Sequence, residues 1–235
     1  MILTISVLII SVLLGGFASR LVAGKKLNIE LPLVFAGSFL FAITIIHIIP
    51  ELFVISEKPQ LIGVYVLVGF FIQRVLEYFS RGIEHGHTHN HGIDSSITKF
   101  SILAALCVHS LLEGSLLTHE SPFHQQHESY SLLLGIVLHK MPAAFALMIV
   151  LSNVKSKWVL LLIFSLASPL GLILSGSLDL APDDLIILFA LVCGSFLHIS
   201  TTIFVETSPE HSLSLNKTVV SIVGAGLAIV VEYLI

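Results

Sequence analysis

Apolar residues run along most of this chain in long stretches, and short polar segments separate them. Each stretch is bounded by charged residues, proline, asparagine or a histidine-rich patch, as expected where a helix meets water. A helix that spans the hydrocarbon core of a bilayer needs about 20 residues. The eight stretches cover approximately residues 2–23, 31–53, 60–79, 100–118, 130–151, 157–178, 183–205 and 217–235. The pattern therefore predicts an all-α polytopic membrane protein with eight transmembrane helices.

The composition excludes a soluble enzyme. Of the 235 residues, 55% are hydrophobic and 11% are charged, whereas soluble domains usually carry about a quarter charged residues. Eight spans leave about 75 residues for loops, so we expect a single transmembrane domain over residues 1–235. The net charge of -4 and the lack of a basic face argue against a nucleic-acid partner. Cys107 and Cys193 lie inside apolar runs, which excludes a disulfide framework.

The positive charges indicate which way the helices face, because Lys and Arg gather in short cytoplasmic loops. With the N-terminus outside, one basic residue, Lys58, falls on the outer side, and Lys140 falls inside the fifth span. The remaining nine fall on the inner side: Arg20, Lys25, Lys26, Arg74, Arg81, Lys99, Lys155, Lys157 and Lys217. No Lys or Arg precedes the first span, which predicts a retained helix rather than a signal peptide. Both termini are therefore expected outside.

Polar and ionisable residues inside spans cost a few kcal/mol each in lipid, which makes them functional candidates. The most suggestive are His47 and Glu51, His109 and Glu113, His139 and Lys140, and His198. The first two pairs are each spaced by four residues, so each shares one helix face. Imidazole nitrogen together with carboxylate oxygen suits zinc, iron or manganese. Pro50 and Pro142 should bend their helices and open space around these groups.

Each candidate also has a purely structural interpretation. A single histidine in a span is more often a hydrogen-bonded packing residue than a ligand, which favours that interpretation for His198, since it stands alone. His47 and Glu51 lie near the outer end of their span and suit an interfacial role equally well. The pair in the middle of the fourth span favours a metal or ion role. The fifth-span pair lies at a comparable depth, which strengthens the case for both.

Two loops are also rich in histidine. The inner loop, about residues 80–99, carries His85, His87, His89 and His91, and the outer loop after the fourth span carries His119, His124 and His127. Alternating histidines in a flexible segment bind divalent metals weakly and release them quickly. We therefore expect auxiliary metal binding by the inner loop, the alternative being a solvated linker.

These motifs resemble the ZIP (ZRT/IRT-like) family of divalent metal transporters along nearly the whole chain. The most specific match is His109-Ser-Leu-Leu-Glu113-Gly114. Weaker matches are His47-Ile-Ile-Pro50-Glu51, His139-Lys140-Met-Pro142, Ser168-Pro169-Leu-Gly171, Gly194-Ser-Phe-Leu and Glu206-Thr-Ser-Pro209-Glu210. The resemblance implies an inverted-repeat bundle of eight helices in a plasma or inner membrane. It also implies transport of divalent transition-metal ions toward the cytosol, with zinc favoured over iron, manganese or cadmium.

The resemblance further implies a transport site between the fourth and fifth spans, with the metal as substrate and no prosthetic group or enzymatic activity. His109, Glu113 and His139 would be the metal ligands, and Ser110 stands where some members have a ligating asparagine. The remaining candidates for gate or entry groups are His47, Glu51 and His198. Which metal is preferred, whether protons are coupled and whether a homodimer forms all stay open.

Lys140 departs from the family pattern. Members with a two-metal centre place carboxylates where this chain has Lys140 and Ala143. An ammonium would then replace the second metal, so we expect one transported ion. A lysine at this depth needs a partner, and we predict an ion pair with Glu113.

Two other functions would also use histidines inside spans. An intramembrane zinc hydrolase would activate a water molecule, but the sequence contains no His-Glu-x-x-His helix. A b-type haem electron carrier would use histidines from facing helices as axial ligands. Transport is the favoured interpretation, and the hydrolase is the alternative.

Overall fold

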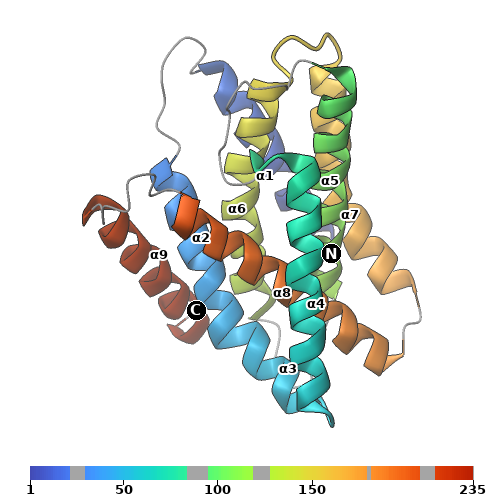
Figure 1. The fold of residues 1–235 in the computed structure, drawn as a ribbon, viewed down its shortest axis with the longest axis vertical. Helices are drawn as coiled ribbons and strands as arrows, with labels where there is room; N and C mark the ends of the chain where they lie inside the picture. The colour runs from blue at the N-terminus through green and yellow to red at the C-terminus, as the bar shows by residue number, and fades with distance from the viewer. Residues whose placement is uncertain (22–29, 84–94, 119–127, 179–180, 207–214, 235) are drawn as a thin grey trace.

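The computed structural model describes residues 1–21, 30–83, 95–118, 128–178, 181–206 and 215–234. Within these ranges no strand occurs, and eight helices are long and apolar enough to cross a membrane (Figure 1). The prediction of an all-α polytopic membrane protein with eight spans is confirmed. The predicted boundaries agree with the observed ones to within about four residues.

The spans follow one another along the chain with short connections. They are α1 (Ile2–Leu21), α2 (Glu30–Ile43) continued by the π-helical turn η1 (Thr44–Ile48) and α3 (Ile49–Ile55), α4 (Pro59–Ser80), α5 (Ser96–Ser115) with the 3-10 turn η3 (Leu116–Thr118), α6 (Glu128–Val150), α7 (Lys157–Ser177), α8 (Pro182–Glu206) and α9 (Leu215–Leu234). Proline begins α4 and α8, where its missing N–H costs nothing. Ser95 caps α5 by accepting a hydrogen bond from the Thr98 N–H.

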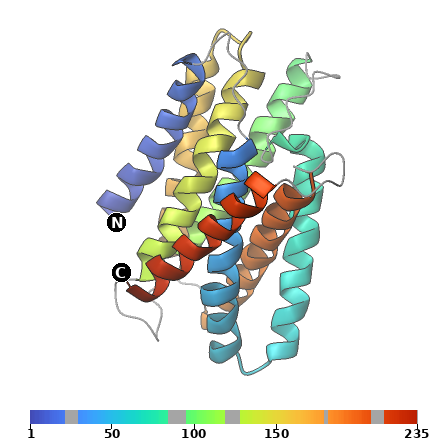
Figure 2. The same cartoon turned by 90° about the vertical axis from the view of Figure 1, so that its left-hand side faces the viewer.

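The helices form four closely packed pairs: α1 with α6, α2 with α9, α4 with α8, and α5 with α7. Further contacts join α1 to α7, α2 to α8, α2 to α6 and α4 to α5, so the four pairs form one continuous bundle (Figure 2). The pairing is unchanged when the first three spans are exchanged with the last three and the fourth with the fifth. An internal repeat of helices would produce this pattern.

Glycine permits the closest of these approaches. A Cβ atom at Gly114 or Gly171 would overlap a backbone carbonyl of the opposite helix in the α5–α7 pair. Gly69 and Gly194 stand in the same relation between α4 and α8. Small residues at helix crossings let backbones approach and gain packing contacts that lipid does not supply. The two pairs are therefore held by backbone-to-backbone contact.

The second span is irregular where it carries His47. The turn η1 is π-helical and leads directly into α3, whose second residue is Pro50. Proline cannot donate a backbone hydrogen bond, so the helix adjusts around the carbonyl one turn earlier. π-Helical turns are rare in proteins, and those that do occur are often found at functional sites. The structure thus has a π turn immediately before Pro50, where the sequence predicted a bend.

Candidate metal site

His109, Glu113 and His139 converge inside the bundle. The first two lie one turn apart on α5, and His139 lies on α6. One possible ligand atom from each lies within 4.8 Å of the other two. Their exposed fractions are 3%, 0% and 2%. Ligands of a tetrahedral zinc ion lie about 3.4 Å apart, from metal–ligand bonds of about 2.1 Å, so small side-chain shifts would complete such a site.

The contacts among these three side chains are short. His109 Nε2 lies 2.9 Å from Glu113 Oε1, and the rings of His109 and His139 meet edge to face with centroids 5.9 Å apart. Among the described residues, the buried His139 Nδ1 has no hydrogen-bond partner. A buried ring nitrogen in this state is costly unless a cation or a donor engages it. The donor set therefore fits a borderline divalent metal.

Lys140 is as deeply buried as the three candidate ligands. Its Nζ lies 2.8 Å from Glu113 Oε2 and donates a hydrogen bond of 2.6 Å to Ser110 Oγ. It also lies 5.3 Å from the centroid of the Phe164 ring, within cation–π range. The predicted Lys140–Glu113 ion pair is confirmed. The Ser110 hydroxyl, a predicted ligand, accepts from this ammonium, and the Ser110 carbonyl accepts from Ser168 Oγ at 2.7 Å.

Side chains of α8 and α4 also reach the site. Ser195 Oγ lies 3.2 Å from His109 Nδ1 and donates to Gln73 Oε1 at 2.8 Å. When Ser195 donates to Gln73, its oxygen is available to accept from His109 Nδ1–H. That arrangement fixes the imidazole ring and leaves Nε2, which faces Glu113, for a metal.

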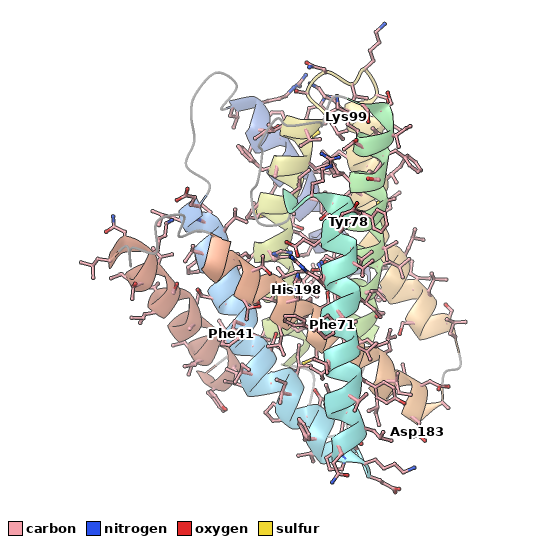
Figure 3. All side chains as sticks on the ribbon, viewed as in Figure 1. Phe41, Phe71, Tyr78, Lys99, Asp183 and His198 are labelled. Atoms are coloured by element: carbon pink, nitrogen blue, oxygen red, sulfur yellow. The ribbon has the colours of Figure 1, made fainter. Side chains whose placement is uncertain are left out.

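His198 has the hydrogen bond and the packing contact that the sequence interpretation favoured, although it stands alone only in the sequence. Its Nε2 lies 2.6 Å from Glu77 Oε2, and that carboxylate also accepts from Arg74 at 2.9 Å. The His198 ring packs edge to face on Phe70 at 4.7 Å. His198 lies beside α4, between the heights of Tyr78 and Phe71 (Figure 3). It belongs to a buried polar pair between α8 and α4.

His47 and Glu51 form a separate cluster with the last span. His47 Nδ1 lies 2.7 Å from Glu232 Oε1 on α9, and His47 Nε2 lies 3.7 Å from Glu51 Oε2. All three side chains are mostly buried. The cluster places a histidine between two carboxylates at the π turn, and the carboxylate from α9 was not foreseen.

The remaining predicted residues lie outside the part of the chain that the structure describes. They are His85, His87, His89 and His91 of the inner loop, and His119, His124 and His127 of the outer loop. Conversely, sequence reasoning missed Gln73, Glu77, Ser195 and Glu232. The signal was available, because three of them are ionisable or amide side chains inside apolar spans, where such groups are costly.

A comparison with family models identifies the family of this chain. The chain matches the model described as ZIP Zinc transporter over residues 84–232, which is more than half of its length and contains the convergent residues of α5 and α6. A comparison with curated proteins gives no match. Members of the matched family are transporters rather than enzymes, which favours transport over the hydrolase and the haem carrier. The chain belongs to the ZIP zinc transporter family of divalent metal transporters.

Proposed function

We propose that the protein moves a divalent transition-metal ion, with zinc preferred, toward the cytosol through His109, Glu113 and His139. The convergence of two buried imidazoles and a buried carboxylate from α5 and α6 carries this proposal. Three protein ligands leave the fourth position of a tetrahedral zinc ion open. A new ligand can bind the ion at that position before a protein ligand dissociates, so the ion can pass to the next site by ligand exchange.

Lys140 limits the core site to one ion. In the metal-free protein, its ammonium neutralises Glu113 at 2.8 Å. A dication bound to the other oxygen of that carboxylate would lie within about 5 Å of the ammonium, given metal–oxygen bonds of about 2.1 Å. Repulsion at this distance keeps the affinity moderate and favours release. The same ammonium fills the space that a second ion would need.

Two further clusters extend the path on either side of the core. Ser195 and His198 lie one turn apart on α8, and Gln73 and Glu77 lie one turn apart on α4. These polar side chains give a departing cation successive partners toward the inner side, so His198 and Glu77 act as an inner gate. On the outer side, His47 and Glu51 with their partner on α9 receive the incoming ion. The histidines of the inner loop bind it weakly after release.

Metal uptake into proteoliposomes, measured ion by ion with and without a pH gradient, tests the proposal. Glu113→Ala and His109→Ala should each lower zinc uptake at least a hundredfold, because several kcal/mol of dehydration is no longer compensated. Glu57→Ala is the matched control, since this carboxylate is exposed beyond α3. Near-normal uptake by folded Glu113→Ala protein would remove this residue from the pathway and refute the mechanism.

A further inference from the structure

The ammonium of Lys140 has two contacts besides its ion pair with Glu113, and both come from uncharged groups. The Ser110 hydroxyl accepts a hydrogen bond from it at 2.6 Å, and the centroid of the Phe164 ring lies 5.3 Å from Nζ. Within the described part of the chain, Glu113 is the one carboxylate that the ammonium contacts. Because Lys140 is 2% exposed, an ammonium that gives up this carboxylate to a metal ion needs partners from the protein.

The two uncharged partners lie on helices that pack backbone to backbone. Ser110 is on α5 and Phe164 is on α7. One turn beyond Phe164, Ser168 Oγ donates a hydrogen bond of 2.7 Å to the Ser110 carbonyl. A Cβ atom at Gly114, one turn beyond Ser110, would overlap the Ser168 carbonyl. The α5–α7 pair therefore fixes the hydroxyl and the ring in place, whereas the ammonium reaches them from α6 on a flexible stem.

A hydroxyl and an aromatic ring can together hold an ammonium. The hydroxyl oxygen accepts a hydrogen bond from it, and the negative face of the ring attracts it. This attraction extends to about 6 Å from the ring centroid, so the Phe164 ring contributes weakly at the observed 5.3 Å. An ammonium released by Glu113 can approach the ring more closely. The attraction then becomes stronger, because Phe164 is buried and water does not weaken it.

We infer that Ser110 and Phe164 form a resting site for the Lys140 ammonium while a metal ion occupies Glu113. This inference rests on the proposed function, and it assigns the Ser110 hydroxyl to the lysine rather than to the metal. The more strongly the resting site holds the ammonium, the less the ammonium competes with the metal for Glu113. Phe164 is therefore a positioning residue, which raises the metal affinity through Lys140 and offers no ligand atom itself.

A double-mutant cycle on the purified full-length protein tests the resting site, with the zinc Kd measured against a competing chelator. Phe164→Leu and Ser110→Ala should each bind zinc about tenfold more weakly than wild type. Lys140→Met removes the ammonium and keeps an apolar stem, and in this background the same two substitutions should change the zinc Kd less than about twofold. Phe39→Leu is the matched control and should leave the Kd unchanged, because Phe39 is a buried phenylalanine of α2 in another core cluster.

Pentafluorophenylalanine in place of Phe164 keeps the shape of the ring and removes the negative charge from its face, so it should weaken zinc binding without opening a cavity. Equal effects of Ser110→Ala with and without Lys140 would make the hydroxyl a metal ligand and overturn its assignment. Equal effects of the Phe164 substitutions in both backgrounds would reveal packing alone, and the resting site would then be wrong. Both outcomes leave the proposed function intact, whereas folded Glu113→Ala protein that binds and transports zinc normally would refute the proposed function itself.

Discussion

Replacing Lys140 by alanine should tighten metal binding and slow transport. The ammonium contacts the carboxylate that the metal needs and is buried with it. Its loss leaves the Glu113 carboxylate without this counter-charge in the metal-free protein. Breaking a buried ion pair from one side costs about 3–5 kcal/mol of folding stability. Metal binding restores the missing positive charge, so the variant gains more stability from metal than the wild type does.

The effect on affinity follows from the distance between the two cations. Two unit charges 4 Å apart interact by about 4 kcal/mol at an effective dielectric constant of 20. A dication doubles this repulsion, to about 8 kcal/mol as an upper bound. The ammonium relieves part of it by turning toward Ser110, to which it already donates. A surviving repulsion of about 3 kcal/mol would make the dissociation constant of Lys140→Ala about a hundredfold lower.

The assay combines zinc titration against a competing chelator with uptake into proteoliposomes. Lys140→Ala should show a lower Kd, a lower maximal uptake rate and a larger metal-induced rise in Tm than wild type. Lys155→Ala is the matched control, because this lysine is exposed between α6 and α7. An unchanged Kd in the folded variant would show that Lys140 does not compete with metal for Glu113.

Lys140→Asp extends the same reasoning to stoichiometry. The new carboxylate would stand beside Ser110 and Glu113, and a two-metal centre needs ions about 3.5–4 Å apart with shared carboxylates. Elemental analysis of purified protein lacking loop-bound metal should give one core ion in wild type and two in the variant. Two core ions in the wild type would refute the role given to Lys140.

Three further predictions test the surroundings of the site. Ser195→Ala should weaken zinc binding about tenfold, because the His109 ring would no longer be held in orientation. Ser200→Ala on the same helix is the control and should leave zinc binding unchanged. Equal zinc Kd values for the two variants would contradict the orienting role of Ser195. Gly171→Ala should lower Tm because the added Cβ meets a backbone carbonyl, at a cost of about 1–3 kcal/mol of folding stability. Gly63→Ala is the control and should not lower Tm, because an added Cβ there meets nothing within 4 Å. Similar Tm values for the two variants would exclude the close packing at Gly171. Replacing the inner-loop histidines His85, His87, His89 and His91 together with serine should leave uptake measurable, since water can replace their coordination. Complete loss of uptake would show that the loop is required for transport.

The fold could be predicted because the bilayer restricts it so strongly. A spanning segment must satisfy its backbone internally and match the hydrocarbon thickness. Apolar length and flanking polar residues were enough to place the span at 157–178, which the structure has at Lys157–Ser177. Helix pairing had no such signal. The close approach at Gly114 and Gly171 depends on which carbonyl faces each glycine, and no spacing within one helix contains that information.

The site was predictable within helices and much less so between them. The spacing of His109 and Glu113 placed both on one helix face. Because Lys140 lies too deep in its span to reach water, its predicted partner was a nearby polar group in the membrane, Glu113. The partner of His198 is 121 residues away along the chain, and that of His47 is 185 residues away. Such contacts require knowledge of which helices pack together. A polar residue in a span therefore signals that a partner exists without identifying it.

The placement of the three polar clusters relative to the helix pairs explains why the core cluster is suited to transport. The His47 cluster joins η1, which continues α2, to α9, and the Glu77–His198 pair joins α4 to α8, so each connects the two spans of a closely packed pair. The core cluster instead joins α5 to α6, which pack far less extensively on each other than on α7 and α1. Backbone packing therefore sets the geometry of the first two clusters. At the core, α5 and α6 are joined mainly through α7 and α1, and they meet each other directly at the buried polar groups of the site. Exchanging an ammonium for a dication therefore acts where these two helices meet.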